Sequence, residues 1–423
     1  EIIYNNDVSI PHQYRWKILK TRWDKTESVL RDKKRYGNFK ENAIKVWKSM
    51  IEAVTIEEIQ KLSRPETYNQ QQKLLSSRID TKVISSERAQ DIYYQKITNL
   101  GSAFREFHNW IKSIIIYSYC SPGKEYRDGK NKKKNVLDLG CGRGGDIMKM
   151  YHSRVGEFVG IDPDYEGLFG VLDSATVRYQ KNVKKYPDFT KATFINADAS
   201  VPLTVESQEK KITTMNPENK KKIETFFGKD KKYDIINSQF AIHYLFDSQL
   251  SINNLTETVK RFLKKDGYLI CTLFDPKQVL NLLNGKQSYT SFYTNDEGQR
   301  SKFFEIVKKF DGDVKDEPGN SIDVHMSWVS QEGKFITEYL VTPKLLIKTM
   351  EKAGCVLVDT DLFVNLYNMN KEWFMNVIDY EENPKNKKFY KNVAKFYGDL
   401  KGAEKEGRIW NDLYRFYVFK KID

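Results

Sequence analysis

Short apolar runs alternate with amphipathic stretches through most of the chain. Runs rich in β-branched and aromatic residues predict strands, and they occupy residues 136–139, 158–162, 192–198, 233–238 and 268–274. Between them, apolar residues recur at helical spacing, which predicts helices over 165–186, 250–263 and 343–353. This alternation indicates an α/β fold built on a mostly parallel sheet. Two later alternating stretches, 326–339 and 413–420, predict further strands, the last of which closes the sheet.

The first hundred residues follow a different pattern. Residues 1–60 mix aromatic and basic side chains and include a predicted amphipathic helix at 42–51. The polar stretch 56–95, with Pro65 as a breaker, predicts a linker with helical pieces. An amphipathic helix is then predicted over 95–119. We therefore expect a first unit at 1–60, a linker at 61–94 and the main domain at 95–423, with the charged stretch 208–232 as a surface insertion within it.

Composition changes this picture in three ways. A content of 39% hydrophobic and 13% aromatic residues is ample for a globular core, and no apolar run reaches the roughly 18 residues of a membrane span. Four widely spaced cysteines without a C-x-x-C pair argue against a zinc site or a disulfide framework, and favour a reducing, cytoplasmic compartment. A net charge of +13 fits a polyanionic partner, although a merely basic surface remains an alternative.

A Gly-rich turn follows the first predicted strand of the main domain. Gly140, Gly142 and Gly145 satisfy the pattern G-x-G-x-x-G, and a helix begins directly after them. Glycines suit such a turn because the backbone bends sharply there and a ligand can press against bare main chain at a helix N-terminus. The turn predicts a nucleotide-type cofactor, and both NAD and S-adenosylmethionine (SAM) satisfy it.

Three carboxylates follow three successive strands: Asp138 before the turn, Asp162 after the second strand and Asp198 after the third. Ligands of open α/β sheets bind at the carboxyl ends of the strands. One acid can accept hydrogen bonds from ribose hydroxyls and another from an adenine amino group, while the first can face the amino-acid end of SAM. Together, and in this order, the acids favour SAM over NAD.

Polar and aromatic residues interrupt the join after the fourth strand. His243, flanked by Gln239 and Tyr244, is therefore a better candidate for a functional role than the other histidines. The sequence Lys264–Gly267 fits the K-x-D-G pattern of a nucleotidyl-transferring lysine, but we interpret it as a turn in which Gly267 supplies a positive φ. No second ligand stands at metal spacing from His108, so no metal site is predicted.

Several ordered motifs resemble one family. The segments 104–113, 136–146 and 239–244 are similar to those of the mRNA cap guanine-N7 methyltransferases, as are 337–341 and 413–419. The resemblance runs from about residue 95 to the end and implies a Rossmann-like class I SAM-dependent methyltransferase fold.

The N-terminal stretch, with Arg22–Lys25, resembles the end of a guanylyltransferase OB-fold whose nucleophilic-lysine motif is absent. Glu1 stands where a Met would begin a chain. We therefore expect the C-terminal part of a multifunctional capping enzyme, of the type found in large DNA viruses or cytoplasmic linear plasmids. Its partners would be capped RNA (GpppN), triphosphatase and guanylyltransferase domains in the same polypeptide, and a stimulatory subunit.

The resemblance also implies site residues. SAM would be held by Lys112, Asp138, Gly140, Gly142, Asp162, Asp198, Gln239 and Tyr244. The cap would be held by His108, Arg143, Lys149, Arg178, His243, Glu338 and Tyr414. His108 departs from cellular members, which carry Asn there, and Arg178 is aligned across a length difference.

The implied reaction is methyl transfer from SAM to N7 of the cap guanine, which leaves S-adenosylhomocysteine. Neutral guanine carries no proton on N7, so no general base is required, and catalysis would rest on proximity and electrostatics, with Glu338 and His243 orienting the guanine. Arg143, Lys149 and Arg178 would suit the triphosphate, or else form a solvated helix face. Two other functions stay open: methylation of another nucleic acid or a small molecule, and an inactive RNA-binding or assembly module.

Overall fold

The computed structural model describes residues 100–122, 133–170, 173–212, 215–229, 231–295, 298–330, 333–398 and 402–423, with shorter pieces before residue 72. The chain divides into two compact units, Glu1–Ser86 and Glu87–Asp423. Among the described residues, no helix is long and apolar enough to cross a membrane. The domain boundaries expected from the sequence, at 60 and 94, remain predictions.

The first unit is described only in part. Its strands β1 (Ile2–Tyr4) and β2 (Trp16–Ile18) pair antiparallel. Helix α3 (Ile56–Leu62) begins with a capping box, in which Thr55 and Glu58 each bond the other's backbone N–H. This helix confirms a helical piece in the polar stretch. The predicted helix at 42–51 and the segment Arg22–Lys25 lie outside the described residues.

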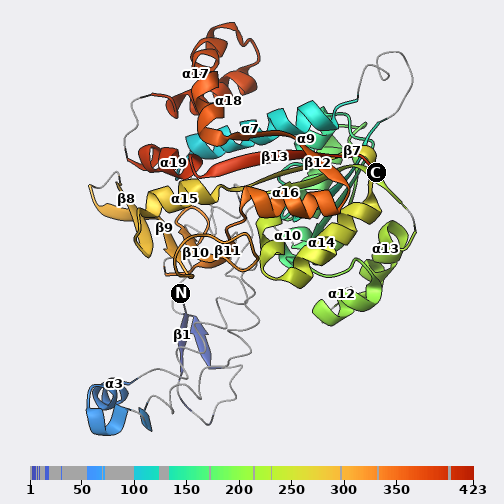
Figure 1. Ribbon diagram of the computed structural model, residues 1–423. Helices are drawn as coiled ribbons and strands as arrows, with labels where there is room; N and C mark the ends of the chain where they lie inside the picture. The colour runs from blue at the N-terminus through green and yellow to red at the C-terminus, as the bar shows by residue number, and fades with distance from the viewer. Residues whose placement is uncertain are drawn as a thin grey trace. The chain divides into compact units, whose positions relative to one another are not determined.

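A seven-stranded sheet forms the centre of the second unit (Figure 1). Its strands, from one edge to the other, are β12 (Cys355–Leu362), β13 (Tyr414–Lys421), β7 (Leu263–Phe274), β6 (Tyr233–Gln239), β3 (Asn135–Leu139), β4 (Glu157–Asp162) and β5 (Lys191–Asn196). Strand β13 is antiparallel to both neighbours, whereas β7, β6, β3, β4 and β5 pair in parallel. The mostly parallel sheet and a strand at the C-terminus are therefore confirmed, but this strand, β13, lies between β7 and β12 rather than at the edge of the sheet.

Helices cover both faces of this sheet because strand side chains alternate between two cores. Val136 and Ile235 face one core, whereas their neighbours Leu137 and Ile236 face the other. The first core includes side chains of α7 (Ser102–Cys120), α9 (Ile147–His152), α10 (Tyr165–Phe169), α11 (Ala175–Lys185), α15 (Pro276–Leu283), α17 (Phe363–Tyr380), α18 (Pro384–Lys395) and α19 (Ala403–Asn411). The second includes those of α13 (Pro217–Phe227), α14 (Gln249–Phe262), α16 (Pro343–Lys352) and the 3-10 helix η2 (Ile242–Phe246), beside α12 (Val205–Lys211).

A four-stranded antiparallel sheet is inserted between α15 and α16. Its order is β11 (Ile336–Tyr339), β10 (Ser321–Met326), β9 (Arg300–Lys308) and β8 (Ser288–Thr294). Phe303, Phe304 and Trp328 from this insertion pack with Phe104 of α7 and Trp410 of α19. The insertion therefore shares the first core with the main sheet.

Three expected elements are wrong in extent. The single helix over 165–186 is two helices, because Gly170 ends α10 and the Ser174 side chain caps α11. The charged stretch 208–232 contains α13, whose Ile223 and Phe227 are buried one helical turn apart. The alternation over 326–339 spans the end of β10, a loop and β11, because Trp328 and Ser330 in the described part of the loop are buried like inward-facing strand residues.

The segment Lys264–Gly267 lies within β7, at an irregularity in its pairing with β6, rather than in a turn before that strand. The left-handed residue is Asp266, with φ of 61°, rather than Gly267. Gly267 is needed for close approach instead, since a Cβ there would lie 2.7 Å from the carbonyl oxygen of Asp234. Strands β8, β9 and β12 and helices α15, α17, α18 and α19 were not predicted.

We expect Gly140→Ala to lower the free energy of unfolding by at least about 2 kcal/mol. Gly140 has φ of +85°, and a Cβ would lie 2.4 Å from the Cβ of Ala241. Gly145→Ala is a matched control in the same turn, because no described atom lies within 4 Å of a Cβ there. Urea unfolding of the unliganded chain, followed by circular dichroism, measures the difference. Equal midpoints for the two variants would contradict the strained turn.

Candidate active site

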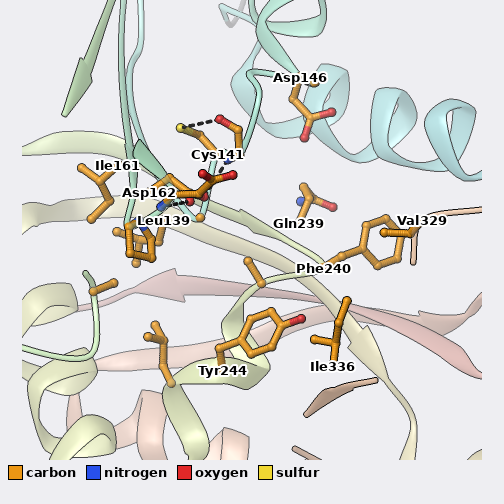
Figure 2. A pocket seen from close by; sticks show the side chains of 18 of the residues that line it. Leu139, Cys141, Asp146, Ile161, Asp162, Gln239, Phe240, Tyr244, Val329 and Ile336 are labelled. Atoms are coloured by element: carbon orange, nitrogen blue, oxygen red, sulfur yellow. Dashed lines mark hydrogen bonds between the residues drawn. The ribbon is translucent and has the colours of Figure 1, made fainter. Parts of the chain in front are cut away.

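A cavity of about 620 Å³ lies at the carboxyl ends of β3, β4, β5 and β6. Residues of α7, the Gly-rich turn, the segments after β4, β5 and β6, and the β10–β11 region line it. Figure 2 shows Asp162, Cys141 and Leu139 at one end and Phe240, Val329 and Ile336 at the other, with Gln239 between them. The cavity thus has an acidic end against the parallel sheet and an aromatic end against the inserted sheet.

The Gly-rich turn is fastened to the end of β4. The backbone N–H groups of Gly140 and Cys141 donate to the carbonyl oxygen of Ile161 at 2.9 and 3.0 Å. The N–H of Gly142 donates to the Asp162 carboxylate at 2.7 Å. The glycines with positive φ are Gly140, Gly142 and Gly144 rather than Gly145. The turn therefore holds Asp162 in place as well as shaping the cavity.

Asp162 is the acid most affected by the site. Its side chain is almost buried and accepts a second hydrogen bond from the N–H of Asp164 at 2.9 Å. Burial raises the pKa of Asp162 to about 7, against the two backbone hydrogen bonds, and the nearby Asp164 and Asp198 add to the rise. Asp198 also lines the cavity, and its carboxylate accepts the N–H of Ser200 at 2.8 Å.

Asp138 lies behind the cavity wall and acts through two amides. The Asn237 side chain donates to Asp138 Oδ1 at 3.0 Å, and Gln239 Nε2 donates to Asn237 Oδ1 at 2.9 Å. Burial raises the pKa of the Asp138 carboxyl well above its ordinary value. Gln239 lines the cavity, and its buried Oε1 has no hydrogen-bond partner among the described residues. That oxygen is therefore an acceptor for a ligand donor.

Asp146 is buried between two ammonium groups. Its carboxylate lies 2.7 Å from Lys112 Nζ and 2.9 Å from Lys149 Nζ. Burial alone would raise the pKa of Asp146, but the two lysines outweigh it and hold that pKa below its usual range. Two cations around one carboxylate leave an excess positive charge, and Lys112 and Asp146 both line the cavity. A ligand carboxylate would balance this charge.

Aromatic rings form the other end of the cavity. The His108 ring stacks on Phe240 with centroids 5.6 Å apart, and Tyr414 meets Phe240 edge-on at 5.0 Å. Phe240 has φ of 57°, an uncommon conformation for a bulky residue. Burial lowers the pKa of His108 to about 3, so its imidazole is neutral near pH 7. With Trp328 also in the lining, this end suits a flat, apolar-faced ring.

His243 and Glu338 form a buried pair next to the cavity. His243 Nε2 lies 3.2 Å from Glu338 Oε2, and each side chain is 3% exposed. Neither lines the cavity, but Tyr244 beside one and Thr337 beside the other do.

The three predicted triphosphate cations also lie outside the cavity lining. Arg178 makes two hydrogen bonds to the Asp173 carboxylate, at 2.8 and 2.7 Å. Arg143 Nη1 lies 3.8 Å from the same carboxylate. Lys149 instead lies against Asp146 and Asn109.

The structure thus brings together Lys112, Gly140, Gly142, Asp162, Asp198, Gln239 and Tyr244 of the predicted cofactor set, and His108 and Tyr414 of the predicted cap set. Sequence reasoning missed Asp146, Phe240 and Trp328 as site residues. Phe240 lies within the motif 239–244 and Asp146 directly follows the glycines, whereas Trp328 lies in no motif that would have indicated a site residue. No cluster of three or more potential metal ligands occurs among the described residues.

The sheet order, with one antiparallel strand, and the Gly-rich turn with acids after the next two strands are those of a class I SAM-dependent methyltransferase. The model of the mRNA (guanine-N(7))-methyltransferase domain matches residues 86–422, so the chain belongs to that family.

Relatives of this chain include viral and cellular capping proteins. The probable mRNA-capping enzyme of Acanthamoeba polyphaga mimivirus is 39% identical over 98% of this chain and 35% of its own length. An mRNA cap guanine-N(7) methyltransferase of Cryptococcus neoformans is 30% identical over 43% of this chain and 24% of its own. The mRNA-capping enzyme of African swine fever virus is 26% identical over 68% and 29%. The chain thus spans about a third or less of the length of these relatives.

A solved SAM-dependent methyltransferase from Clostridium acetobutylicum has a TM-score of 0.39 and 12% identity, covering 82% of this chain and 98% of that chain. The fold assignment therefore rests on the sheet order and the family match.

We expect SAM affinity to rise with pH because Asp162 has a pKa of about 7 in the free protein. A carboxylate accepts hydroxyl hydrogen bonds better than a carboxylic acid does, so the dissociation constant should fall roughly tenfold between about pH 6 and pH 8. Asp162→Asn should bind more weakly and lose most of this dependence. Calorimetry measures the dissociation constant of SAM for both proteins at each pH. Protonation changes of SAM itself affect both proteins equally, so they do not contribute to the difference. Parallel pH profiles would contradict the assignment.

Proposed function

We propose that this chain transfers the methyl group of SAM to N7 of the terminal guanine of capped RNA (GpppN). The observation that carries the proposal is one cavity with acidic acceptors at one end and an aromatic slot at the other, in a member of the guanine-N7 methyltransferase family. We further propose that the chain works in the cytoplasm, beside triphosphatase and guanylyltransferase domains of the same polypeptide. The length of the mimivirus relative, of which the chain covers 35%, supports this larger arrangement.

The acidic end fits SAM by the chemistry of its donors and acceptors. Asp162 would accept the ribose hydroxyls and Asp198 the adenine amino group. Lys112, with an excess positive charge beside it, would bind the carboxylate of the amino-acid part. Gln239 Oε1 would accept from its ammonium group, and Asp138 would position Gln239 through Asn237. SAM supplies an activated methyl group when it is bound.

The aromatic end would hold the guanine. His108, Phe240 and Tyr414 offer ring faces and edges within one slot, and the neutral imidazole of His108 can stack without burying a charge. Methylation makes the purine cationic, so a fixed negative charge nearby favours the product-like state. Glu338, buried against His243, would supply that charge.

The three cations assigned to the triphosphate differ in their exposure and in their ion pairs. Arg143 and Arg178 are partly exposed and share Asp173, so RNA phosphates would compete with that carboxylate for both guanidinium groups. Lys149 is buried and paired with Asp146. We therefore assign Lys149 to positioning Asp146 and Lys112, and keep Arg143 and Arg178 for the phosphates.

Incubation with labelled SAM and capped RNA, followed by identification of the methylated position, tests the function directly. Label on guanine N7 is the expected result. Transfer to an internal nucleotide or to free GTP in preference to GpppN-RNA would favour the alternative of another nucleic acid or a small molecule. Absence of SAM binding would favour an inactive RNA-binding or assembly module.

We expect Glu338→Gln to lower kcat for cap methylation at least about 100-fold, equivalent to about 2.7 kcal/mol. The substitution keeps the size of the side chain and removes the charge next to His243. Glu305→Gln is the matched control, since Glu305 lies in the same sheet and pairs with Lys302. Methyl transfer and SAM binding are measured on both variants, and SAM binding should stay within threefold. Survival of kcat within tenfold would show that Glu338 has no such role.

A further inference from the structure

An exposed aromatic surface lies on the helices next to the candidate active site. Helices α17 and α18 stand together over α7 (Figure 1), and α18 contacts both of the others. Trp373 of α17 is 43% exposed, and Tyr117 of α7 is 39% exposed. The Trp373 ring stacks on Trp110 of α7 with centroids 5.8 Å apart and meets Tyr390 of α18 edge-on at 5.5 Å. Rings from three helices therefore share one surface, and such exposure of large aromatic side chains often marks a binding site.

This surface continues beyond the rings. Met369 lies one helical turn from Trp373 and is 66% exposed, and Ile114 lies one turn from Trp110 and is 38% exposed. Tyr117 lies seven residues after Trp110, about two helical turns, so both side chains point to the same side of α7.

Lysines border the rings. Helix α18 carries five lysines and no acid in its sequence PKNKKFYKNVAK. Lys387 is three residues before Tyr390 and so neighbours that ring on the helix, and Lys391, four residues after Lys387, lies next to Lys387. Among the described residues no ion pair to an acid is found for either lysine. The nearby acids are Glu372 and Asp379 of α17, both exposed, and Glu381 at the connection to α18, where it accepts the N–H of Asn383.

The position of these lysines disfavours a purely structural role. Lys385 and Lys387 lie in the first turns of α18, where the helix dipole already supplies partial positive charge and carboxylates are normally preferred. The arrangement costs stability and concentrates positive potential beside the exposed rings. Aromatic faces combined with basic side chains are what proteins use to bind single-stranded nucleic acid without sequence preference.

We propose that Tyr117, Trp373 and Tyr390, with Lys387 and Lys391, form a binding surface for the first single-stranded nucleotides of the RNA that carries the cap. The proposal rests on the proposed function, and helix α7 links the two sites. Asn109 lines the cavity, and Tyr117 lies eight residues further along the same helix, about 12 Å at 1.5 Å per residue. That distance corresponds to about four nucleotides at the ~3.4 Å spacing of a stacked strand.

The test compares capped RNA of about twenty nucleotides with the cap dinucleotide GpppA, using the full chain. Trp373→Ala and the double variant Lys387→Gln/Lys391→Gln should each raise KM for the long RNA about tenfold, with kcat and KM for GpppA within twofold of the parent. Loss of one stacked base is worth ~1–3 kcal/mol, which spans this effect. The double variant should also reduce the slope of log KM against log salt by about 1.4, at ~0.7 for each phosphate contact.

Two controls match these variants. Met375→Ala removes another exposed side chain of α17, and Lys348→Gln/Lys352→Gln removes an exposed lysine pair from α16 on the opposite face of the main sheet. Both should leave KM for long RNA unchanged. Because Trp373 packs on Trp110, thermal unfolding of each variant is measured, and the lysine variant tests the surface without disturbing that packing.

Binding of an uncapped RNA of the same length, followed by fluorescence anisotropy, separates this proposal from the proposed function. Weaker binding by both surface variants supports the RNA surface even if the parent does not methylate caps. Equal effects on GpppA and long RNA, or unchanged binding of uncapped RNA, would overturn it. Unchanged binding of uncapped RNA would indicate that the surface binds a protein partner instead.

Discussion

The burial of Asp146 between Lys112 and Lys149 is the constraint on which the second unit depends. The three side chains come from α7 and from the turn and helix after β3, so one ion cluster joins the covering helix to the sheet. Breaking a buried pair by removing one partner leaves an uncompensated charge and is costly. The cluster therefore fixes how α7 lies over the Gly-rich turn. Since α7 also packs against α18, α19 and the inserted sheet, the positions of these elements follow from the same contact.

The cavity takes its two walls from two sheets with different geometry. The parallel sheet ends in acids and in backbone N–H groups that fasten the turn to β4, so its wall is rigid and polar. Ile336 of the inserted sheet, with Trp328 and Val329 of the loop between β10 and β11, lines the same space and makes the opposite wall apolar. A nucleoside with a charged amino-acid part fits the first wall, and a flat base fits the second. Methyl transfer needs both ligands in one enclosure, and neither sheet encloses that space alone.

Much of the fold and part of the site could be predicted from the sequence. The strands of the parallel sheet are short apolar runs, and Asp162 and Asp198 follow them where ligands of such sheets bind. The inserted sheet was harder to predict, because the pairing of its strands depends on tertiary packing. In addition, the loop with Trp328 continues the hydrophobic alternation of strand β10. The ion pairs of the three cations could not be predicted either, because the sequence shows only that the residues are basic. In the structure, Asp173 pairs with Arg143 and Arg178, whereas Lys149 pairs with Asp146.

Different side chains of α7 face two different surfaces of the molecule. Lys112 and Asn109 face the cavity, whereas Trp110 and Tyr117 support or join the exposed aromatic surface. A helix transmits position along its axis because its backbone hydrogen bonds keep the rise per residue fixed. For a ligand bound in the cavity, the exposed aromatic surface therefore lies at a fixed distance along α7. The ion cluster at Asp146 then has two consequences, since it sets the charge of the cofactor end and the direction in which α7 leaves the active site.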